Sequence, residues 1–274
     1  MANTGLGLII IGCNNLCAID SGLEEAIRRL GGSCGFDIVR FTTADAFSRD
    51  EAAALKRIRD GHMDGFSWYT EERVRRANRP QELLEGAKSV ISLALSYNTG
   101  EPNPPDSQPR GKIARYAWGD DYHDVIKKRL RKFVSKLPSI AGRPVSTRIF
   151  VDDGPMNDRA AAARAGIGWF GKNTNILTQS HGSWVFLAQV ITDIPLEPDA
   201  PLKKTCGECV LCIDACPTGG NCLSLCHRQQ ALHFIPYHRA TRRNPTRTSP
   251  SGRRLGFRVR HLSGCLPCQP QGNR

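Results

Sequence analysis

The sequence lacks any long apolar run: no window reaches the roughly 18 consecutive apolar residues that a membrane-spanning helix needs. The stretch GLGLIIIG near the start is too short for such a helix and has no basic flank typical of a signal peptide. We therefore expect a cytoplasmic protein with no membrane partner. With 274 residues, of which 40% are hydrophobic, the chain is long enough to bury a core.

Residues 221–274 lack lysine, aspartate and glutamate altogether, although they contain ten arginines. Of the net charge of +12, ten units come from this segment, which leaves +2 for residues 1–220. The body of the chain is thus almost balanced in charge, which weakens the nucleic-acid-binding interpretation that the total charge invites. The segment also shows neither the strand nor the helix period of hydrophobic residues, so we expect a disordered tail.

Strand-like and helical segments alternate up to about residue 200, which predicts a layered α/β domain. Apolar runs predict strands, and helical spacing predicts helices, the longest of which spans residues 121–137. The predicted strands cover residues 36–45, 87–97, 147–151 and 183–196, and the other helices residues 21–32 and 156–166. One face of the longest helix is apolar and the other is basic. We interpret the basic face as solvated surface in preference to a phosphate-binding surface.

Eight of the eleven cysteines lie after residue 205, which in a reducing compartment favours metal ligands over disulfides. Four of them precede a proline in the spacing C-x2-C-x2-C-x3-C-P, the ferredoxin run for a [4Fe–4S] cluster. These are Cys206, Cys209, Cys212 and Cys216. Because the fourth cysteine of such a run ligates the other cluster in two-cluster proteins, a second run is expected downstream. A structural zinc site and unligated core cysteines are the weaker alternatives.

Two further motifs carry less information. Asp152 and Asp153 follow a predicted strand, where catalytic groups often lie, but Asp-Gly-Pro is more often a simple turn. The glycines in RAGIGWFGKNTN lack the spacing of a phosphate-binding loop. Gly166, Gly168 and Gly171 are expected to let a bulky cofactor or another backbone segment approach closely.

Taken together, four segments closely resemble epoxyqueuosine reductase. They are residues 111–133, 150–177, 182–196 and 206–220, and the resemblance extends from about residue 60 to residue 220. It implies a cytoplasmic iron–sulfur and cobalamin enzyme that reduces epoxyqueuosine to queuosine at the wobble position of tRNA. Two clusters would pass electrons to a base-off cobalamin from an external donor that the sequence does not identify, and the protein would act as a monomer.

The resemblance also implies an organisation of the α+β class. Residues 1–200 would form the layered α/β cobalamin-binding catalytic domain, and residues 201–220 the start of a small ferredoxin-like [4Fe–4S] module. Residues 221–274 are an out-of-pattern tail, and the helical-repeat domain with which the family docks tRNA is expected to be absent.

By position in the family motifs, the resemblance makes Asp152 the proton donor. Opening an epoxide leaves an oxygen anion, and a partly buried carboxyl near a corrin would have the raised pKa that a general acid needs. Asp153 occupies a place that a small residue usually fills and is not included. The implied cofactor-binding residues are Lys172, Asn173, Thr174, Tyr116 and, in a less certain register, Arg73.

After Gly220 the chain departs from the family pattern, which continues with a second cysteine run. If the codons are read one base later, with third positions chosen freely, both missing motifs are permitted in order. We therefore interpret the tail as the product of a frameshift near Gly219 or Gly220, whether in the gene or in its sequencing, with Cys222 and Cys226 as by-products. At most one incomplete ligand set then remains, and we predict that the chain cannot assemble both clusters and has impaired or no activity.

Three other functions stay open. The first is another corrinoid iron–sulfur reductase, of the reductive dehalogenase kind, which turnover of a halogenated substrate would reveal. The second is a ferredoxin-like electron carrier, which failure to bind cobalamin would favour. The third is a nucleic-acid-binding protein that uses the arginine-rich tail, which salt-dependent tRNA binding lost on truncation at residue 220 would support.

Overall fold

The computed structural model describes residues 17–64, 66–100, 114–216 and 221. Its centre is a four-stranded sheet in the order β1-β2-β6-β3, in which every neighbouring pair is antiparallel. These strands are β1 (Ile38–Thr43), β2 (Ser89–Ser96), β3 (Thr147–Phe150) and β6 (Val185–Thr192). A small hairpin pairs β4 (Trp169–Phe170) with β5 (Ile176–Leu177). The four strands predicted from the sequence are confirmed.

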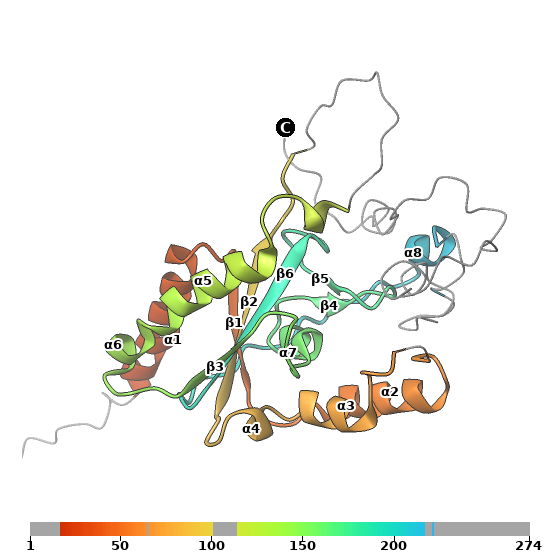
Figure 1. Cartoon of the computed structure of the whole chain (residues 1–274). Coiled ribbons are helices and arrows are strands. Elements are labelled where there is room, and N and C mark those ends of the chain that lie inside the picture. The colour runs from red at the N-terminus through yellow and green to blue at the C-terminus, as the bar shows by residue number, and fades with distance from the viewer. Residues whose placement is uncertain (1–16, 65, 101–113, 217–220, 222–274) are drawn as a thin grey trace, which may run out of the picture.

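The strand directions depart from the layered α/β architecture that the alternation of elements predicts. Between β1 and β2 the chain forms α2 (Ser48–Arg59), α3 (Glu71–Ala77) and α4 (Pro80–Leu83). Figure 1 shows these three helices together at one end of the sheet, where they do not cross it. Because a parallel neighbour requires a crossover along the face of the sheet, β2 returns antiparallel to β1. The mixed α and β content agrees with the expected α+β class.

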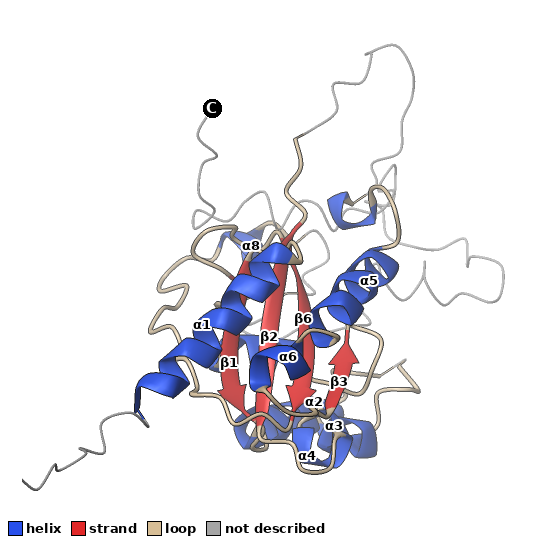
Figure 2. Cartoon of the chain, turned by 90° about the vertical axis from the view of Figure 1, so that its left-hand side faces the viewer, coloured by secondary structure: helices blue, strands red, loops and turns tan. Residues whose placement is uncertain are grey.

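One face of the sheet is covered by α1 (Cys17–Ser33), α5 (Tyr122–Val134) and α6 (Leu137–Ala141), as Figure 2 shows. The apolar face predicted for residues 121–137 is confirmed, since Ile126, Leu130 and Phe133 are fully buried. They belong to one core with Phe41 and other residues of the strands. Each such side chain contributes about 1.5–3 kcal/mol of burial. None of the helices in the described part of the chain is long and apolar enough to cross a membrane.

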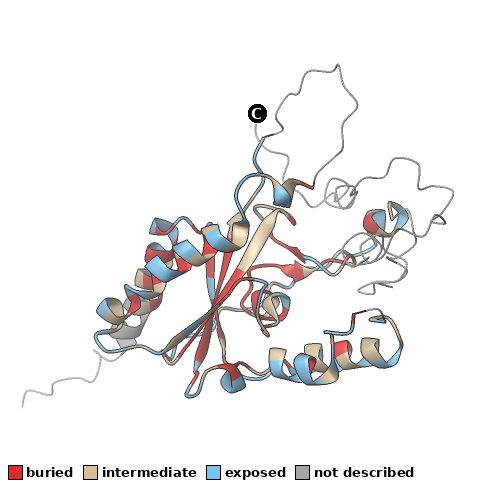
Figure 3. Ribbon diagram, in the orientation of Figure 1, coloured by how far each residue is buried: buried red, intermediate tan, exposed pale blue. Residues whose placement is uncertain are grey.

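The opposite face of the sheet carries α7 (Asp158–Arg164). Ala160, Ala161 and Ala162 are fully buried there, and their small side chains let the helix lie close to β2 and β6. In Figure 3 buried residues gather along much of the central strands and on part of α7, with intermediate residues at the strand ends. Asn157 caps the helix by accepting a hydrogen bond from the Ala160 N–H at 3.2 Å. This places the first residue of α7 at the end of β3, where the Asp-Gly-Pro loop begins.

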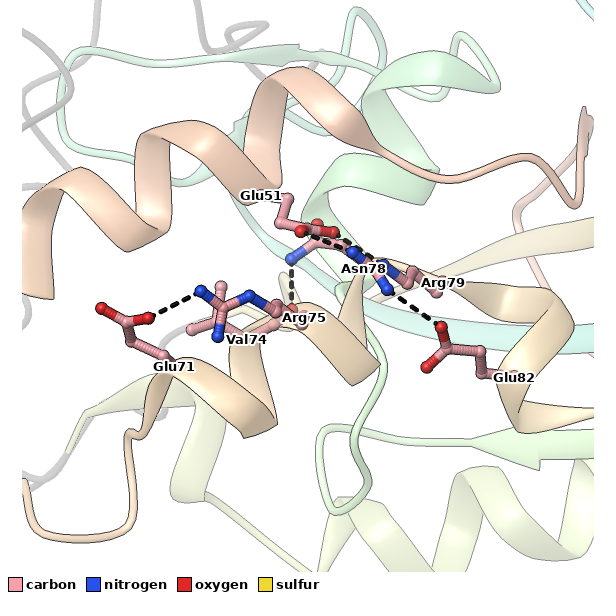
Figure 4. A network of polar contacts seen from close by, with 7 residues as sticks. All are labelled: Glu51, Glu71, Val74, Arg75, Asn78, Arg79 and Glu82. Atoms are coloured by element: carbon pink, nitrogen blue, oxygen red, sulfur yellow. Dashed lines mark hydrogen bonds and ion pairs between the residues drawn. The ribbon is translucent and has the colours of Figure 1, made fainter.

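Polar side chains fix the α2–α4 layer (Figure 4). The Arg79 guanidinium donates to both carboxylate oxygens of Glu51 at 3.2 and 3.1 Å, and to Glu82 at 3.1 Å. Asn78 is buried, and its amide donates to the Val74 carbonyl at 2.8 Å. Its Oδ1 accepts from Asn157 at 2.9 Å and its carbonyl accepts from the Phe47 N–H at 2.8 Å. Asn78 thereby joins the start of α2, the end of α3 and the cap of α7.

Gly166 and Gly168 face the chain's own backbone. A Cβ atom at Gly166, where φ is +76°, would lie 2.3 Å from the Ala200 carbonyl oxygen, and one at Gly168 would lie 2.3 Å from that of Leu177. Close backbone approach, one of the two reasons expected from the sequence, therefore accounts for both glycines. It packs the end of α7 against residues 200–201 and the β4 segment against β5.

Replacement of Gly168 by alanine is expected to lower the free energy of unfolding by about 2 kcal/mol, because Cβ and a rigid backbone oxygen cannot share that space. Urea denaturation followed by circular dichroism measures the change. Gly22→Ala is the matched control: Gly22 lies inside α1, and a Cβ atom added there would meet nothing within 4 Å. The control should be neutral or stabilising by up to about 1 kcal/mol. Equal effects of the two substitutions would contradict the packing argument.

Candidate active site

Asp152 lies on the loop that follows β3, in the left-handed conformation with φ of +53°. Its side chain is exposed, so the expectation of a partly buried carboxyl is wrong for this structure. The Tyr122 hydroxyl, at the start of α5, donates to Asp152 Oδ2 at 2.9 Å. Burial raises the pKa of Tyr122, and the charge of Asp152 and the hydrogen bond to it raise that pKa further. The phenol therefore remains protonated and orients one carboxylate oxygen of Asp152.

Two other predicted residues lie beside this loop. Tyr116 is half-buried in the short 3₁₀ helix Arg115–Ala117, close enough to Tyr122 to help raise its pKa. The Arg73 guanidinium lies 3.5 Å from the Gly154 carbonyl oxygen, at the outer limit of a hydrogen bond. The structure thus brings Tyr116 and Arg73 to the neighbourhood of Asp152.

The neighbouring carboxylate, Asp153, forms an ion pair with Lys127 of α5. Burial acts to raise the pKa of Asp153, but the hydrogen bond from Lys127 and contacts with backbone N–H groups outweigh it and lower the pKa. Asp153 is accordingly a structural anion that fastens the loop to α5.

A third carboxyl in this place, Asp158, escaped the sequence analysis. It is the first residue of α7; Oδ1 is inaccessible to solvent and has no hydrogen-bond partner among the described residues. Burial raises the pKa of Asp158 to about 8, the charges of Asp152 and Asp153 add to the shift, and Arg159 opposes it. The sequence offers one sign that Asp158 is unusual, namely an acidic residue directly after an Asn helix cap. This sign is weak, because acidic residues are common at helix starts and are mostly exposed there.

Lys172, Asn173 and Thr174 form the turn between β4 and β5. Asn173 is buried, and its Oδ1 accepts from the Asn175 N–H at 3.2 Å. Its Nδ2 has no partner among the described residues. A buried amide nitrogen of this kind is costly unless it meets an acceptor. The turn therefore suits a ligand with hydrogen-bond acceptors, such as the amide groups around a corrin.

The turn is tied to α7. Thr174 has a positive φ of +64°, and its carbonyl and hydroxyl oxygens accept hydrogen bonds from Arg159 Nη1 at 3.1 and 3.3 Å. Since Arg159 follows Asp158 in the chain, the first turn of α7 contacts both groups of predicted residues. It positions the Thr174 turn on one side and the Asp152 loop on the other.

The cysteine segment includes the short helix α8 (Leu211–Asp214) and packs against the β4–β5 hairpin. Burial raises the pKa of the Cys212 thiol, as do the neighbouring Cys206 and Cys209, while Lys172 lowers it. These thiols therefore lie close to one another and to the Lys172 turn. Cys216 is half-buried at the end of the segment. The donor set suits an iron–sulfur cluster, for which thiolates are the usual ligands.

In the described ranges, no three or more His, Cys, Asp or Glu side chains converge as they would around one metal ion. That geometry applies to a single ion, whereas a four-iron cluster spaces its thiolates more widely. The predicted tail and the second cluster lie outside the described residues. Asn221 alone is described there, and its amide donates to the Cys212 carbonyl at 2.9 Å.

A cavity of about 640 Å³ separates α2 and α7 from the cysteine segment. Its walls include Trp169, Lys172, Arg164, Lys204 and Cys206. The volume lies within the range of ligand pockets, and the positive side chains and aromatic surface of these walls suit an anionic group. Lys172 connects this cavity with the β4–β5 turn.

Comparison with known proteins agrees with this geometry. Residues 76–153 match the family described as "Epoxyqueuosine reductase QueG, DUF1730". The epoxyqueuosine reductase of Leadbetterella byssophila is 40% identical over 195 residues, which are 71% of this chain and 63% of that protein. The chain is homologous to the epoxyqueuosine reductases. It spans less than two thirds of the length of the curated relatives that it matches.

Solved structures of epoxyqueuosine reductases show the same fold. One, with an epoxyqueuosine-modified tRNA-Tyr stem loop, is 37% identical with a TM-score of 0.73 and covers 78% of this chain and 56% of its own. Another, from Bacillus subtilis, is 36% identical with a TM-score of 0.71 and also covers 78% of this chain and 56% of its own. In that structure a catalytic loop that contains an aspartate is swung out of the active site.

Proposed function

We propose that this chain corresponds to the catalytic part of an enzyme that reduces epoxyqueuosine to queuosine in tRNA. The observation that carries the proposal is the hydrogen bond from Tyr122 of α5 to Asp152 on the loop after β3, in a chain 37% identical to an epoxyqueuosine reductase crystallised with a modified tRNA stem loop. The same similarity favours this reaction over that of a dehalogenating reductase. It also favours an enzyme over an electron carrier, because the matched region is 71% of this chain and is thus far longer than the cysteine segment.

Asp152 supplies the proton in the proposed reaction. When the first C–O bond of the epoxide opens, the oxygen keeps the electron pair and must be protonated, and a second proton lets it leave as water, so that reduction to the alkene takes two electrons and two protons. Tyr122 donates to Oδ2, which leaves Oδ1 to carry the proton toward the substrate oxygen. The exposed position of Asp152 lets it approach a nucleotide that extends from a tRNA loop and regain a proton from water.

The proposed cofactor positions follow the homology. Lys172, Asn173 and Thr174 would hold a cobalamin on the β4–β5 turn, with the unpaired Asn173 Nδ2 available to an acceptor. Tyr116 and Arg73 would border the same space beside the Asp152 loop. Bound cobalamin supplies the electrons that reduce the epoxide.

Cys206, Cys209 and Cys212 would bind one [4Fe–4S] cluster, for which a fourth ligand is required, and Cys216 would serve the other. Lys172 of the β4–β5 turn lies near Cys212, and this proximity of the turn to the cysteine segment suits electron transfer from the cluster to the cofactor. No disulfide joins the cysteines at positions 34, 206, 209, 212 and 216, in keeping with our proposal of a reducing cytoplasm. We further propose that the protein is a monomer.

The proposal is tested with a frame-corrected version of the full chain, reconstituted anaerobically with iron, sulfide and cobalamin. We expect it to convert epoxyqueuosine-containing tRNA to queuosine-containing tRNA in the presence of a strong reductant, as nucleoside mass spectrometry can measure. A halogenated phenol and tRNA without the modification serve as controls. Turnover of the halogenated substrate, with none of the modified tRNA, would refute the proposed reaction.

A further inference from the structure

The outer side of α5 carries a row of exposed cations. The helix lies on the outside of the sheet (Figure 2), and its apolar side chains are buried against the core. The exposed cations on the opposite side are Lys128, Arg131 and Lys132 of α5, and Lys136, which lies between α5 and α6. The helix contains a single acidic residue, Asp124, in its first turn. We call Lys128, Arg131, Lys132 and Lys136 the basic stripe.

The basic stripe has no acidic partner in the part of the chain that the structure describes. None of its four side chains forms a hydrogen bond or an ion pair there. The remaining cations of α5 are engaged. Lys127 pairs with Asp153, and Arg129 donates to the Gly35 carbonyl oxygen. The four cations are therefore available to a ligand.

Other surface helices pair a cation with an acid one turn away. The pairs are Arg29 with Glu25 on α1, Lys56 with Asp60 on α2, and Arg75 with Glu71 on α3. On α5, by contrast, Lys128 and Lys132 are like charges one turn apart, which destabilise a helix. The stripe is thus a local positive surface on a body, residues 1–220, whose net charge is only +2. A ligand with closely spaced negative charges would remove this repulsion.

The surface of α5 suits a nucleic-acid backbone better than an acidic protein. Protein interfaces combine a polar rim with an apolar core. The exposed large apolar side chains of the described residues are Trp68, Val210 and Leu211, and none of them lies on α5. Nucleic-acid interfaces are polar and strongly positive, because lysine and arginine neutralise phosphates.

The helix that bears the stripe begins at the candidate active site. Tyr122, its first residue, donates to Asp152, and Lys127 pairs with Asp153 of the same loop. With a rise of 1.5 Å per residue, the helix is about 20 Å long. An RNA stem that followed α5 would therefore have one end beside Asp152.

We propose that the basic stripe binds the phosphate backbone of an RNA stem whose loop presents the reacting nucleotide to Asp152. The choice of RNA rests on the proposed function, in which tRNA is the substrate. Phosphate contacts supply affinity and orientation, and they read no base sequence. The sequence alone favoured a solvated surface. The lack of acidic partners among the described residues and the start of α5 beside Asp152 favour the phosphate-binding interpretation.

The test is equilibrium binding of a fluorescent, unmodified anticodon stem–loop RNA, followed by anisotropy at several salt concentrations. It uses the frame-corrected full chain, because the ten arginines of residues 221–274 would bind RNA by themselves. The combined substitutions Lys128→Gln, Arg131→Gln and Lys132→Gln should weaken binding about tenfold or more at about 0.1 M salt. The slope of log affinity against log salt concentration should become shallower by about 2, since three phosphate contacts are lost.

A second triple variant removes the same charge from cations that have acidic partners. It carries Arg29→Gln, Lys56→Gln and Arg75→Gln, and it should change the affinity by less than about threefold. Circular dichroism should show that both variants fold, because glutamine is a good helix former. Equal losses of affinity and slope in the two variants, or no loss in the α5 variant, would overturn the proposal.

Polyglutamate serves as a probe for the alternative ligand, an acidic protein. The parent chain and the α5 variant are compared in their binding of polyglutamate and of the RNA. If the α5 substitutions abolish binding of polyglutamate and leave binding of the RNA unchanged, the stripe fits an acidic protein and the assignment to RNA is wrong. A loss confined to the RNA would support the proposal.

Turnover separates the stripe from the proposed reaction. In the reconstituted, frame-corrected protein, the α5 variant should raise KM for epoxyqueuosine-containing tRNA about tenfold and leave kcat within about twofold, because only binding is affected. If RNA binding depends on the stripe but no protein reduces epoxyqueuosine, the proposed function fails and the RNA-binding surface stands. If the parent reduces epoxyqueuosine and RNA binding does not depend on the stripe, the surface is refuted and the function stands.

Discussion

Asp152→Asn in the frame-corrected protein is expected to lower the single-turnover rate of epoxyqueuosine reduction by about a hundredfold or more. An amide is far too weak an acid to replace a carboxylic acid as proton donor, while asparagine tolerates the positive φ that Asp152 adopts. Tyr122 can still donate to the amide oxygen, so the loop should keep its position. Quenched-flow reactions analysed by nucleoside mass spectrometry give the rate, and the affinities for cobalamin and tRNA should be unchanged.

Asp153→Asn provides the comparison within the same loop. It removes a carboxylate that is paired with Lys127, whereas the Tyr122 hydroxyl donates to Asp152, so its effect on the rate should be a small fraction of that at Asp152. If the two substitutions slow the reaction equally, or if Asp152→Asn retains the parent rate, Asp152 is not the proton donor.

The second large effect concerns iron. Two [4Fe–4S] clusters require about eight irons per chain, and the chain with the present sequence should bind far fewer. A version whose reading frame is shifted by one base after Gly220 should bind the full number. The reason is the number of thiolates, because the printed sequence offers Cys206, Cys209 and Cys212 no matched fourth ligand and Cys216 no companions. Iron and sulfide assays, together with electron paramagnetic resonance after reduction, measure both.

Cys222 and Cys226 provide the control for this prediction. If they are by-products of a shifted frame, replacing both by serine should leave the iron content of the printed chain unchanged. Loss of iron in that variant would show that the tail supplies substitute ligands. About eight irons in the printed chain would refute the predicted ligand deficit.

The sequence predicted the strands, the longest helix and the cysteine segment because each depends on local pattern. β2 is a mostly apolar, largely buried run, and the spacing of Ile126, Leu130 and Phe133 defines one helical face. Strand direction was not predictable in this way. It depends on where α2–α4 pack, which is decided by contacts such as Arg79 with Glu51, 28 positions apart.

The residues of the candidate site also differ in whether their prediction depended on local sequence or on tertiary contacts. Asp152 and the Lys172–Thr174 turn could be proposed from the sequence because they belong to motifs that resemble those of the family. Asp158 was missed because its burial depends on Gln189 and on the approach of the alanine face of α7 to the sheet. A pattern shows which side chains are present, whereas the perturbation of a carboxyl depends on what surrounds it in three dimensions.

The buried amide of Asn78 has a mechanical consequence. Its hydrogen bonds connect the helical layer beside the sheet with the cap of α7, one residue before Asp158. A displacement of that layer by a docked macromolecule would strain or break these bonds, each worth about 1 kcal/mol, and would be felt at the start of α7. A displacement of the α2–α4 layer at the protein surface would thus alter the start of α7, next to the Asp152 loop, without direct contact between the docked molecule and that loop.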